Sequence, residues 1–187
     1  MSVDVDAVEL ALTRLVDLGD AVRRDVALGP MTTYRVGGAA TLFVRVTDRG
    51  QLTAVAEAAS ASGLPVLVVG RGSNLLVADA GFHGIAIGLA DLEATVDIDA
   101  ATARVTASAG VALPVLARKT AAAGLSGFEW AVGVPGSIGG AVRMNAGGHG
   151  SDMAASLVEV TVFDLAAGAE RTLQATELGL AFRSVSY

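Results

Sequence analysis

The sequence predicts an α+β fold, because helical and extended segments follow one another without a regular strand–helix–strand alternation. Apolar residues make up 52% of the 187 residues and aromatic residues only 4%, so we expect a core built mostly of Val, Leu and Ala. A charged spacer at 90–94 (ADLEA) divides the chain into two halves, each with its own strands and helices.

The first half is predicted to begin with a helix. Apolar residues recur near the helical period over 5–24, and Asp4 or Asp6 can cap the start of that helix. A second, Ala-rich helix is expected over 48–62, ending at Gly63. The strands predicted in this half lie at 42–46, 66–69, 75–78 and 84–89.

The second half combines two predicted hairpins with one clear helix. Alternating residues at 95–99 and 104–109 predict one hairpin, and a strand at 157–164 is expected to pair with 170–175. Pro114 suits the first turn of a helix that runs to Ala123 and is closed by Gly124, and Thr176 with Glu177 indicates a further helix start.

Charge and composition exclude several classes of function. A net charge of −6 argues against nonspecific binding of nucleic acid and against an anionic membrane surface. The chain has no cysteine and two histidines, so we predict no metal site. The acidic N-terminus does not match a secretory signal, and no uncharged run approaches the roughly 20 residues of a membrane span. We therefore expect a soluble, cytoplasmic, monomeric protein.

One glycine-rich loop follows the predicted buried strand at 66–69. Its residues, Gly70, Arg71, Gly72, Ser73 and Asn74, allow a tight turn with inward-pointing amides, and the side chains add donors suited to phosphate oxygens. An extended run follows, which excludes the dinucleotide fingerprint that opens a helix, and no Gly-Lys-Ser/Thr follows, which excludes a P-loop. An ordinary strand-to-strand turn is the alternative interpretation.

A second glycine-rich stretch spans 127–150, where eight of 24 residues are glycine. Ser137 is a suitable cap for a short helix, whose first amides are expected to be free for an anion. Gly139 and Gly140 fall in its first turn, where glycine costs about 1 kcal/mol relative to alanine. We therefore expect a ligand, or a second backbone, against that face. Two such cradles in one chain favour an extended diphosphate ligand such as a dinucleotide.

Four segments, taken together, resemble the UDP-N-acetylenolpyruvoylglucosamine reductase (UDP-N-acetylmuramate dehydrogenase) family. They are TTYRVGG (32–38), VLVVGRGSNLLVAD (66–79), GLSGFEWAVGVPGSIGGAVRMNAGGHG (124–150) and ELGLAFRS (177–184).

The resemblance implies a two-part FAD-binding domain of the vanillyl-alcohol oxidase type, with FAD between the halves. The lead-in would cover 1–30 and the FAD-binding domain 31–187, with halves at about 31–90 and 95–187. The family's substrate domain would be absent from these residues.

The resemblance also implies which residues contact FAD. They are Tyr34, Val36, Gly37, Gly70, Arg71, Gly72, Ser73, Asn74, Leu75, Ala109, Gly110, Gly133, Val134, Pro135, Gly136, Ser137, Ile138, Gly139, Gly140, Asn145 and Gly147.

The family's chemistry is implied in the same way. NADPH reduces FAD, and the reduced flavin passes hydride to UDP-N-acetylglucosamine enolpyruvate in peptidoglycan precursor synthesis. Arg183 matches the arginine of a Tyr-Arg-x-Ser motif, and such a cation would stabilise the enolate. Phe182 replaces the tyrosine, and the motif serine is displaced by one position. The family's proton-donating serine and assisting carboxylate belong to the absent segment, so we expect FAD binding without full turnover.

Two alternatives remain open. One is another FAD-linked oxidoreductase of the same fold, and the other is a non-catalytic module or fragment that binds FAD or a nucleotide. For the aromatic residues of the second glycine-rich stretch, we expect Trp130 in the core and His149 packed within its loop.

Overall fold

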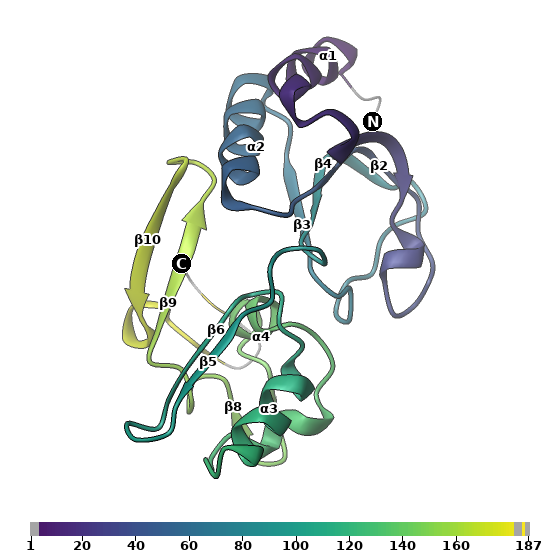
Figure 1. Cartoon of the computed structure of the whole chain (residues 1–187). Coiled ribbons are helices and arrows are strands. Elements are labelled where there is room, and N and C mark those ends of the chain that lie inside the picture. Colours follow the sequence, from purple (N-terminus) through teal and green to yellow (C-terminus); the bar gives the residue numbers. More distant parts are fainter. Residues whose placement is uncertain (1–3, 182–184, 186–187) are drawn as a thin grey trace. The chain divides into compact units, whose positions relative to one another are not determined.

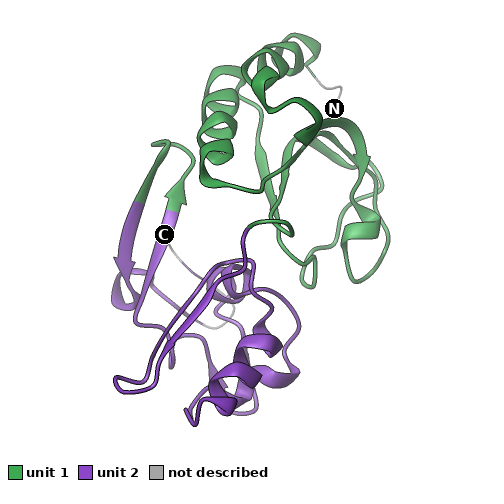
Figure 2. Cartoon of the chain, in the orientation of Figure 1, with its two compact units in different colours: residues 1–92, 163–170 green, residues 93–162, 171–187 purple. Residues whose placement is uncertain are grey.

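The structure is a computed structural model that describes residues 4–181 and residue 185. Its elements are shown in Figure 1. The chain forms two compact units, here called unit 1 (residues 1–92 and 163–170) and unit 2 (93–162 and 171–187), which Figure 2 distinguishes by colour. The predicted cofactor residues are divided between the two units.

Unit 1 is built on a four-stranded sheet with the order β1-β2-β4-β3. β1 is antiparallel to β2, whereas β2 and β3 are both parallel to β4. The strands are β1 (Val22–Ala27), β2 (Ala39–Arg45), β3 (Val66–Val69) and β4 (Phe82–Gly88).

Two helices pack together in unit 1 and contribute to one core cluster with the sheet. In α1 (Val5–Arg14) the Asp4 carboxylate accepts from the amides of Asp6 and Ala7, as a capping aspartate should. The helix α2 (Arg49–Ser62) ends at Gly63, whose φ of 69° is the left-handed conformation expected of a C-terminal glycine. Their shared core consists of Val8, Ala11, Leu15, Leu42, Val44, Val46, Val55, Ala58, Leu64, Ile85 and Ile87.

A second apolar cluster of the same sheet is completed by loops rather than by α-helices. Leu28 and Val77, from two separate loops, pack with Phe43, Val69 and Ala86 of the strands. A short 3₁₀ turn, η2 (Gly29–Met31), follows Leu28. The two loops that supply this cover also contain the unit 1 residues predicted to bind the cofactor.

Unit 2 holds the second glycine-rich stretch around its own core. Its core residues are Leu113, Ala117, Trp130, Ala131, Ala141, Val142, Met153, Leu178 and Val185. Its elements are β5 (Val96–Asp99), β6 (Arg104–Ala107), α3 (Leu113–Ala122), η3 (Glu129–Gly133), α4 (Ile138–Arg143), β7 (Gly147–Gly148) and β8 (Ser151–Asp152). The predicted hairpin formed by β5 and β6 and the predicted helix at Pro114 are both confirmed.

The last hairpin is divided between the two units: its tip is part of unit 1 and the rest is part of unit 2. Its strands β9 (Glu159–Asp164) and β10 (Ala169–Gln174) pair as predicted, and η4 (Ala175–Glu177) follows. The tip, 163–170, is part of unit 1, where Leu165 packs against the helix-covered core and Glu170 lies 3.0 Å from Arg49.

Two expectations about secondary structure are wrong. The helix predicted over 5–24 stops at Arg14, and a 3₁₀ segment, η1 (Val16–Ala21), leads into β1. Gly19, with a φ of 49°, breaks the helical path, and pairing with β2 makes 22–27 a strand. The run 75–78 is not a strand, because Leu75 and Val77 pack into the loop-covered core instead of joining a ladder. The α+β class itself is confirmed.

Candidate functional site

Unit 1 brings together its two predicted cofactor segments. The amide of Thr33 donates to the carbonyl of Gly72 (3.1 Å), and the amide of Gly38 donates to the carbonyl of Ala78 (2.9 Å). These bonds connect the segment that contains Tyr34, Val36 and Gly37 to the loop that starts at Gly70 and continues through Leu75 to Ala78.

Close backbone packing explains two of the glycines in these loops. Gly72 has a φ of +64°, and a Cβ on it would overlap the carbonyl of Met31. Gly37 has a φ of +113°, and a Cβ there would lie 2.6 Å from the Cβ of Val77. Both positions therefore require glycine for the fold of unit 1 before any ligand is considered.

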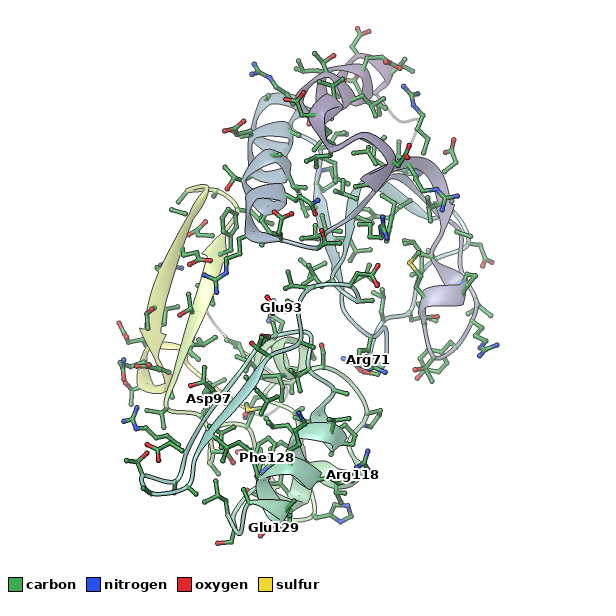
Figure 3. The ribbon with its side chains drawn as sticks, in the orientation of Figure 1. Arg71, Glu93, Asp97, Arg118, Phe128 and Glu129 are labelled. Atoms are coloured by element: carbon green, nitrogen blue, oxygen red, sulfur yellow. The ribbon has the colours of Figure 1, made fainter. Side chains whose placement is uncertain are left out.

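The same loops carry exposed apolar and cationic side chains. Tyr34 is 63% exposed, Val36 51% and Leu76 70%. Figure 3 shows Arg71 at the loop that follows β3, and this residue is also exposed. The arrangement offers both an apolar surface and a positive charge to a ligand.

Backbone amides in the first glycine-rich loop are available to an acceptor. Among the residues that the structure describes, the amides of Arg71, Gly72 and Asn74 donate no hydrogen bond. Gly72 is itself buried, and amides in such surroundings normally find an acceptor. Consecutive unpaired amides in a tight glycine turn form the kind of nest that binds an anion.

In unit 2 the segment after β6 pairs with the start of α4. The amide of Gly139 donates to the carbonyl of Ala109, and that of Ile138 donates to the carbonyl of Val111, both at 2.9 Å. The amide of Leu113 donates in return to the carbonyl of Gly136 (3.0 Å). Ala109 and Gly110 are thus brought beside the glycines of the second stretch, as one wall of unit 2.

The prediction that the first amides of α4 are free to bind an anion is wrong. Ser137 caps the helix as expected, since its Oγ accepts from the amide of Gly140 (3.3 Å). With Ile138 and Gly139 also paired, all three of the first helical amides have protein acceptors, so none is free for a phosphate. A Cβ on Gly139 would lie 2.9 Å from the Cβ of Ala109, so the backbone that approaches this glycine is the protein's own.

Asn145 is buried and its side chain is used within unit 2. Its Nδ2 donates to Asp152 Oδ2 and to the carbonyl of Ala181, and its Oδ1 accepts from the amide of Ala154. The structure therefore gives the Asn145 side chain a role inside the protein, although the residue was predicted to face the cofactor. Sequence reasoning did not identify Asp152 or Ala181, because nothing in their spacing marks them as partners.

The glycines around Asn145 are closely packed. Gly147 pairs with Asp152 across the two short strands β7 and β8, where a Cβ would lie 2.8 Å from the Asp152 Cβ. A Cβ on Gly133 would lie 3.4 Å from His149 Nε2, and one on Gly148 would lie 3.1 Å from Val134 Cγ2. The loop therefore folds back on the Gly133–Val134 segment, and the ring of His149, an exposed residue, lies next to Gly133.

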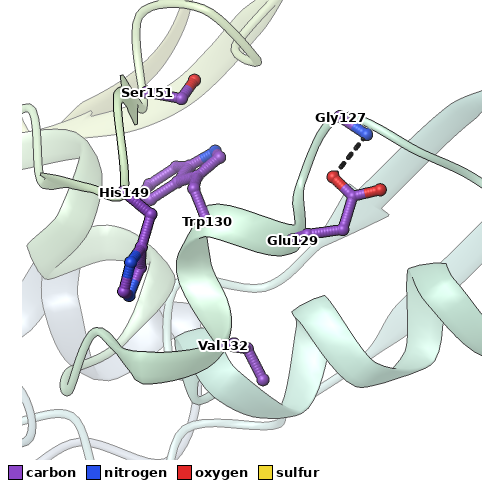
Figure 4. Close-up of a pocket in the computed structure, with 6 residues that line it drawn as sticks. All are labelled: Gly127, Glu129, Trp130, Val132, His149 and Ser151. Atoms are coloured by element: carbon purple, nitrogen blue, oxygen red, sulfur yellow. Dashed lines mark hydrogen bonds between the residues drawn. The ribbon is translucent and has the colours of Figure 1, made fainter.

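A shallow pocket of about 470 Å³ opens in unit 2 next to this loop. It is lined by Gly127, Glu129, Trp130, Val132, His149 and Ser151, which Figure 4 shows. Glu129 accepts a 2.7 Å hydrogen bond from the amide of Gly127. None of the predicted cofactor residues lines this pocket, and Trp130 is buried in the core as expected.

Arg183, the predicted catalytic residue, lies outside the described residues, as does Phe182. Over 4–181 and at 185, no group of three or more His, Cys, Asp or Glu side chains could hold a metal ion. Over the same part of the chain, no helix combines the length and the apolar character needed to cross a membrane.

The fold and the glycine-rich loops agree with what comparison with known families shows. The family described as FAD binding domain matches residues 40–174, and the chain belongs to this family, whose cofactor is FAD.

Among curated proteins the chain is similar to UDP-N-acetylenolpyruvoylglucosamine reductases. It is 43% identical to that of Synechococcus sp. (strain RCC307) over 87% of this chain and 53% of the relative. It is 44% identical to that of Nostoc sp. (strain PCC 7120) over 87% of this chain and 49% of the relative. The chain thus spans about half the length of the curated relatives it matches.

Solved structures agree with the expected fold. UDP-N-acetylenolpyruvylglucosamine reductase from Thermus caldophilus matches with a TM-score of 0.69 and 36% identity, covering 88% of this chain and 56% of that one. p-Cresol methylhydroxylase matches with a TM-score of 0.68 at 14% identity, over 91% of this chain and 36% of that one, which shows the fold alone. The two-part fold of the vanillyl-alcohol oxidase type is confirmed.

Proposed function

We propose that this chain holds FAD for the reduction of UDP-N-acetylglucosamine enolpyruvate to UDP-N-acetylmuramate. NADPH would be the electron donor, and the reaction would serve peptidoglycan precursor synthesis in the cytoplasm. The names and identities of the reductase relatives support the reaction, and membership of the FAD binding domain family supports the cofactor.

The observation that carries the proposal is the set of unpaired amides in the loop after β3. The amides of Arg71, Gly72 and Asn74 donate no hydrogen bond within the described residues, and the exposed Arg71 adds a positive charge. A dinucleotide pyrophosphate supplies the anionic oxygens that such a loop lacks. FAD fits this donor set better than FMN, because only FAD carries the second phosphate.

The unit 2 residues support the cofactor in a different way. Because the amides of Ile138, Gly139 and Gly140 are all paired within the protein, this segment cannot act as an anion site through the helix start. Gly133–Gly140, Ala109 and Gly110 would instead present a smooth, rigid wall to the ring system. Hydrogen bonds to the 109–113 segment hold that wall in place.

Arg183 is the proposed catalytic residue. The bound flavin would supply the hydride, and its addition to the enolpyruvyl group leaves negative charge on an enolate that already bears a carboxylate. A guanidinium beside that charge stabilises the transition state more than the ground state. Phe182 supplies no hydroxyl to orient that guanidinium, which leaves the orientation to other contacts.

A cofactor-binding module with little turnover of its own is the second candidate. One observation favours this candidate: about half the length of the reductase relatives has no counterpart in these residues. Hydride transfer needs the reacting atoms held about 3–3.5 Å apart, and residues outside this chain would contribute to that positioning.

An anaerobic assay of NADPH oxidation separates these functions. FAD-loaded chain is mixed with NADPH, with and without the enolpyruvyl substrate, and Arg183→Ala is compared with Arg104→Ala, an exposed residue on β6. The reductase proposal expects substrate-dependent oxidation that only Arg183→Ala abolishes. Flavin reduction that ignores substrate supports the module, and failure to hold FAD contradicts both.

A further inference from the structure

Thr32 is a buried polar residue that directly follows η2, and the proposed reaction gives it no role. It is 5% exposed, its Oγ1 donates to the carbonyl of Gly29 at 3.0 Å, and the same oxygen accepts from the amide of Arg35 at 3.1 Å. A hydroxyl can fill both roles at once, because it has one donor and two acceptor positions. The Thr32 carbonyl lies 3.3 Å from the Arg35 amide, so the hydroxyl is the nearer of its two acceptors.

The hydroxyl holds a turn that exposes two apolar side chains. Arg35 has a φ of +56°, a left-handed conformation that is unfavourable for residues other than glycine. Tyr34 and Val36, on either side of it, are 63% and 51% exposed. Within the described residues, the Thr32 hydroxyl is the one side-chain group that hydrogen-bonds to the backbone of 33–37. It therefore stabilises the backbone conformation in which Tyr34 and Val36 face solvent.

The same turn is attached to the first glycine-rich loop. The amide of Thr33 donates to the carbonyl of Gly72 at 3.1 Å, and this bond fixes the orientation of one peptide group in that loop. The amides of Arg71, Gly72 and Asn74, in the same loop, donate no hydrogen bond within the described residues. Because Thr33 directly follows Thr32, the turn that the hydroxyl holds also places the donor to Gly72.

We propose that Thr32 is a positioning residue for the FAD site of unit 1, acting through the turn at 33–35. This inference rests on the proposed function, in which Tyr34, Val36 and the loop after β3 contact FAD. Thr32 does not need to touch the cofactor. Its hydroxyl fixes the turn before FAD arrives, so that less conformational freedom is lost on binding.

Three substitutions separate this role from a general contribution to stability. Thr32→Val keeps the shape of the side chain but removes both hydroxyl bonds, whereas Thr32→Ser keeps the hydroxyl. Thr120→Val is the matched control, because Thr120 is also 5% exposed and its Oγ1 donates to the carbonyl of Ala117, likewise three residues earlier, at 2.9 Å. Thr120 belongs to α3 of unit 2, which contains none of the predicted cofactor residues.

Amide hydrogen exchange of the full 187-residue chain without flavin tests the turn itself. In Thr32→Val we expect the amides of Thr33 and Arg35 to exchange about tenfold faster, as for a lost hydrogen bond. Thr32→Ser should restore the original rates, and Thr120→Val should not change them. Unchanged rates in Thr32→Val would overturn the proposal, because the hydroxyl would then not fix the turn.

Circular dichroism first checks that the variants fold. If Thr32→Val does not fold, Thr32→Ala takes its place, since it removes the hydroxyl without burying a methyl group against two polar backbone groups. Loss of the fold in both variants would show that the whole of unit 1 depends on Thr32, and it would overturn the local role proposed for the hydroxyl.

FAD titration tests the consequence for the cofactor. The Kd for FAD should rise about tenfold in Thr32→Val, return towards the original value in Thr32→Ser, and stay unchanged in Thr120→Val. An unchanged Kd in Thr32→Val, or an equal rise in Thr120→Val, would overturn the positioning role. If the unchanged chain does not bind FAD, the proposed function fails instead, and the exchange rates measured without flavin still decide whether Thr32 fixes the turn.

Discussion

The amide of Gly139 donates a 2.9 Å hydrogen bond to the carbonyl of Ala109, and a Cβ on Gly139 would lie 2.9 Å from the Ala109 Cβ. This pair explains why a helix tolerates glycine in its first turn. The approach of the chain's own 109–113 segment leaves no room for a side chain, whether or not a cofactor is bound.

We predict that Gly139→Ala destabilises the protein. Alanine would gain about 1 kcal/mol in helix propensity, but the overlap with Ala109 is expected to cost about 1–3 kcal/mol. Ala109→Gly in the same chain should recover most of the loss. Gly133→Ala, where a Cβ would be 3.4 Å from His149, should change stability by no more than about 0.5 kcal/mol. Urea denaturation of the four proteins measures these differences, and an unaffected Gly139→Ala would contradict the packing explanation.

Gly72 and Gly63 provide a matched comparison in unit 1. Both have left-handed backbones, with φ of +64° and +69°, but a Cβ on Gly63 would meet nothing within 4 Å, whereas one on Gly72 would overlap the Met31 carbonyl. Gly63→Ala should cost about 1–2 kcal/mol from backbone conformation alone. Gly72→Ala should cost clearly more, as thermal denaturation can show. Equal losses would mean that the Met31 contact relaxes easily.

The ion pair at the tip of the last hairpin should contribute little. Arg49 Nη1 and Glu170 Oε2 are 3.0 Å apart, and the Arg49 side chain is 77% exposed. A double-mutant cycle with Arg49→Ala and Glu170→Ala is expected to give a coupling of about 0.2–1 kcal/mol that decreases as salt is added. A larger coupling that persists in high salt would show that the pair is shielded from solvent.

Asp99 should titrate below its ordinary pKa of 3.8, chiefly because its carboxylate accepts hydrogen bonds from the Thr102 side chain and backbone, and from Ala101. Since the folded pKa is the lower one, its contribution to stability is present above the ordinary value and is lost as pH falls through the folded value. Thr102→Val should move the pKa of Asp99 back upward. An NMR titration of the carboxyl carbon checks this, and an unchanged pKa would assign the effect to the backbone amides alone.

Local sequence signals predicted much of the fold. Asp4, Ser137 and Gly63 cap helices where their residue types indicated, because capping depends on neighbours in the chain. The strand at 22–27 was missed because pairing with β2 and the backbone of Gly19 decide it. Pairing between separate strands produces no periodic pattern in the sequence of the strand itself.

The sequence predicted which glycines the candidate site would use. It did not predict which backbone contacts make those glycines necessary. The loop after β3 does present unpaired amides, as the turn chemistry suggested. The start of α4 does not, because Ile138 and Gly139 donate to the distant 109–111 segment and Gly140 donates to the capping Ser137. The paired role of Asn145 was hidden for the same physical reason, since its partner Ala181 is distant in sequence.

Flavin titration of the purified chain tests whether the protein binds FAD through the loop after β3. We predict that the protein binds FAD with a perturbed flavin absorption band, releases FAD on denaturation, and binds FMN far more weakly because FMN lacks the second phosphate. A protein that folds, as judged by circular dichroism, but leaves the spectrum of added FAD unchanged would contradict it. Equal affinity for FMN would contradict the assignment of the loop after β3 to the pyrophosphate.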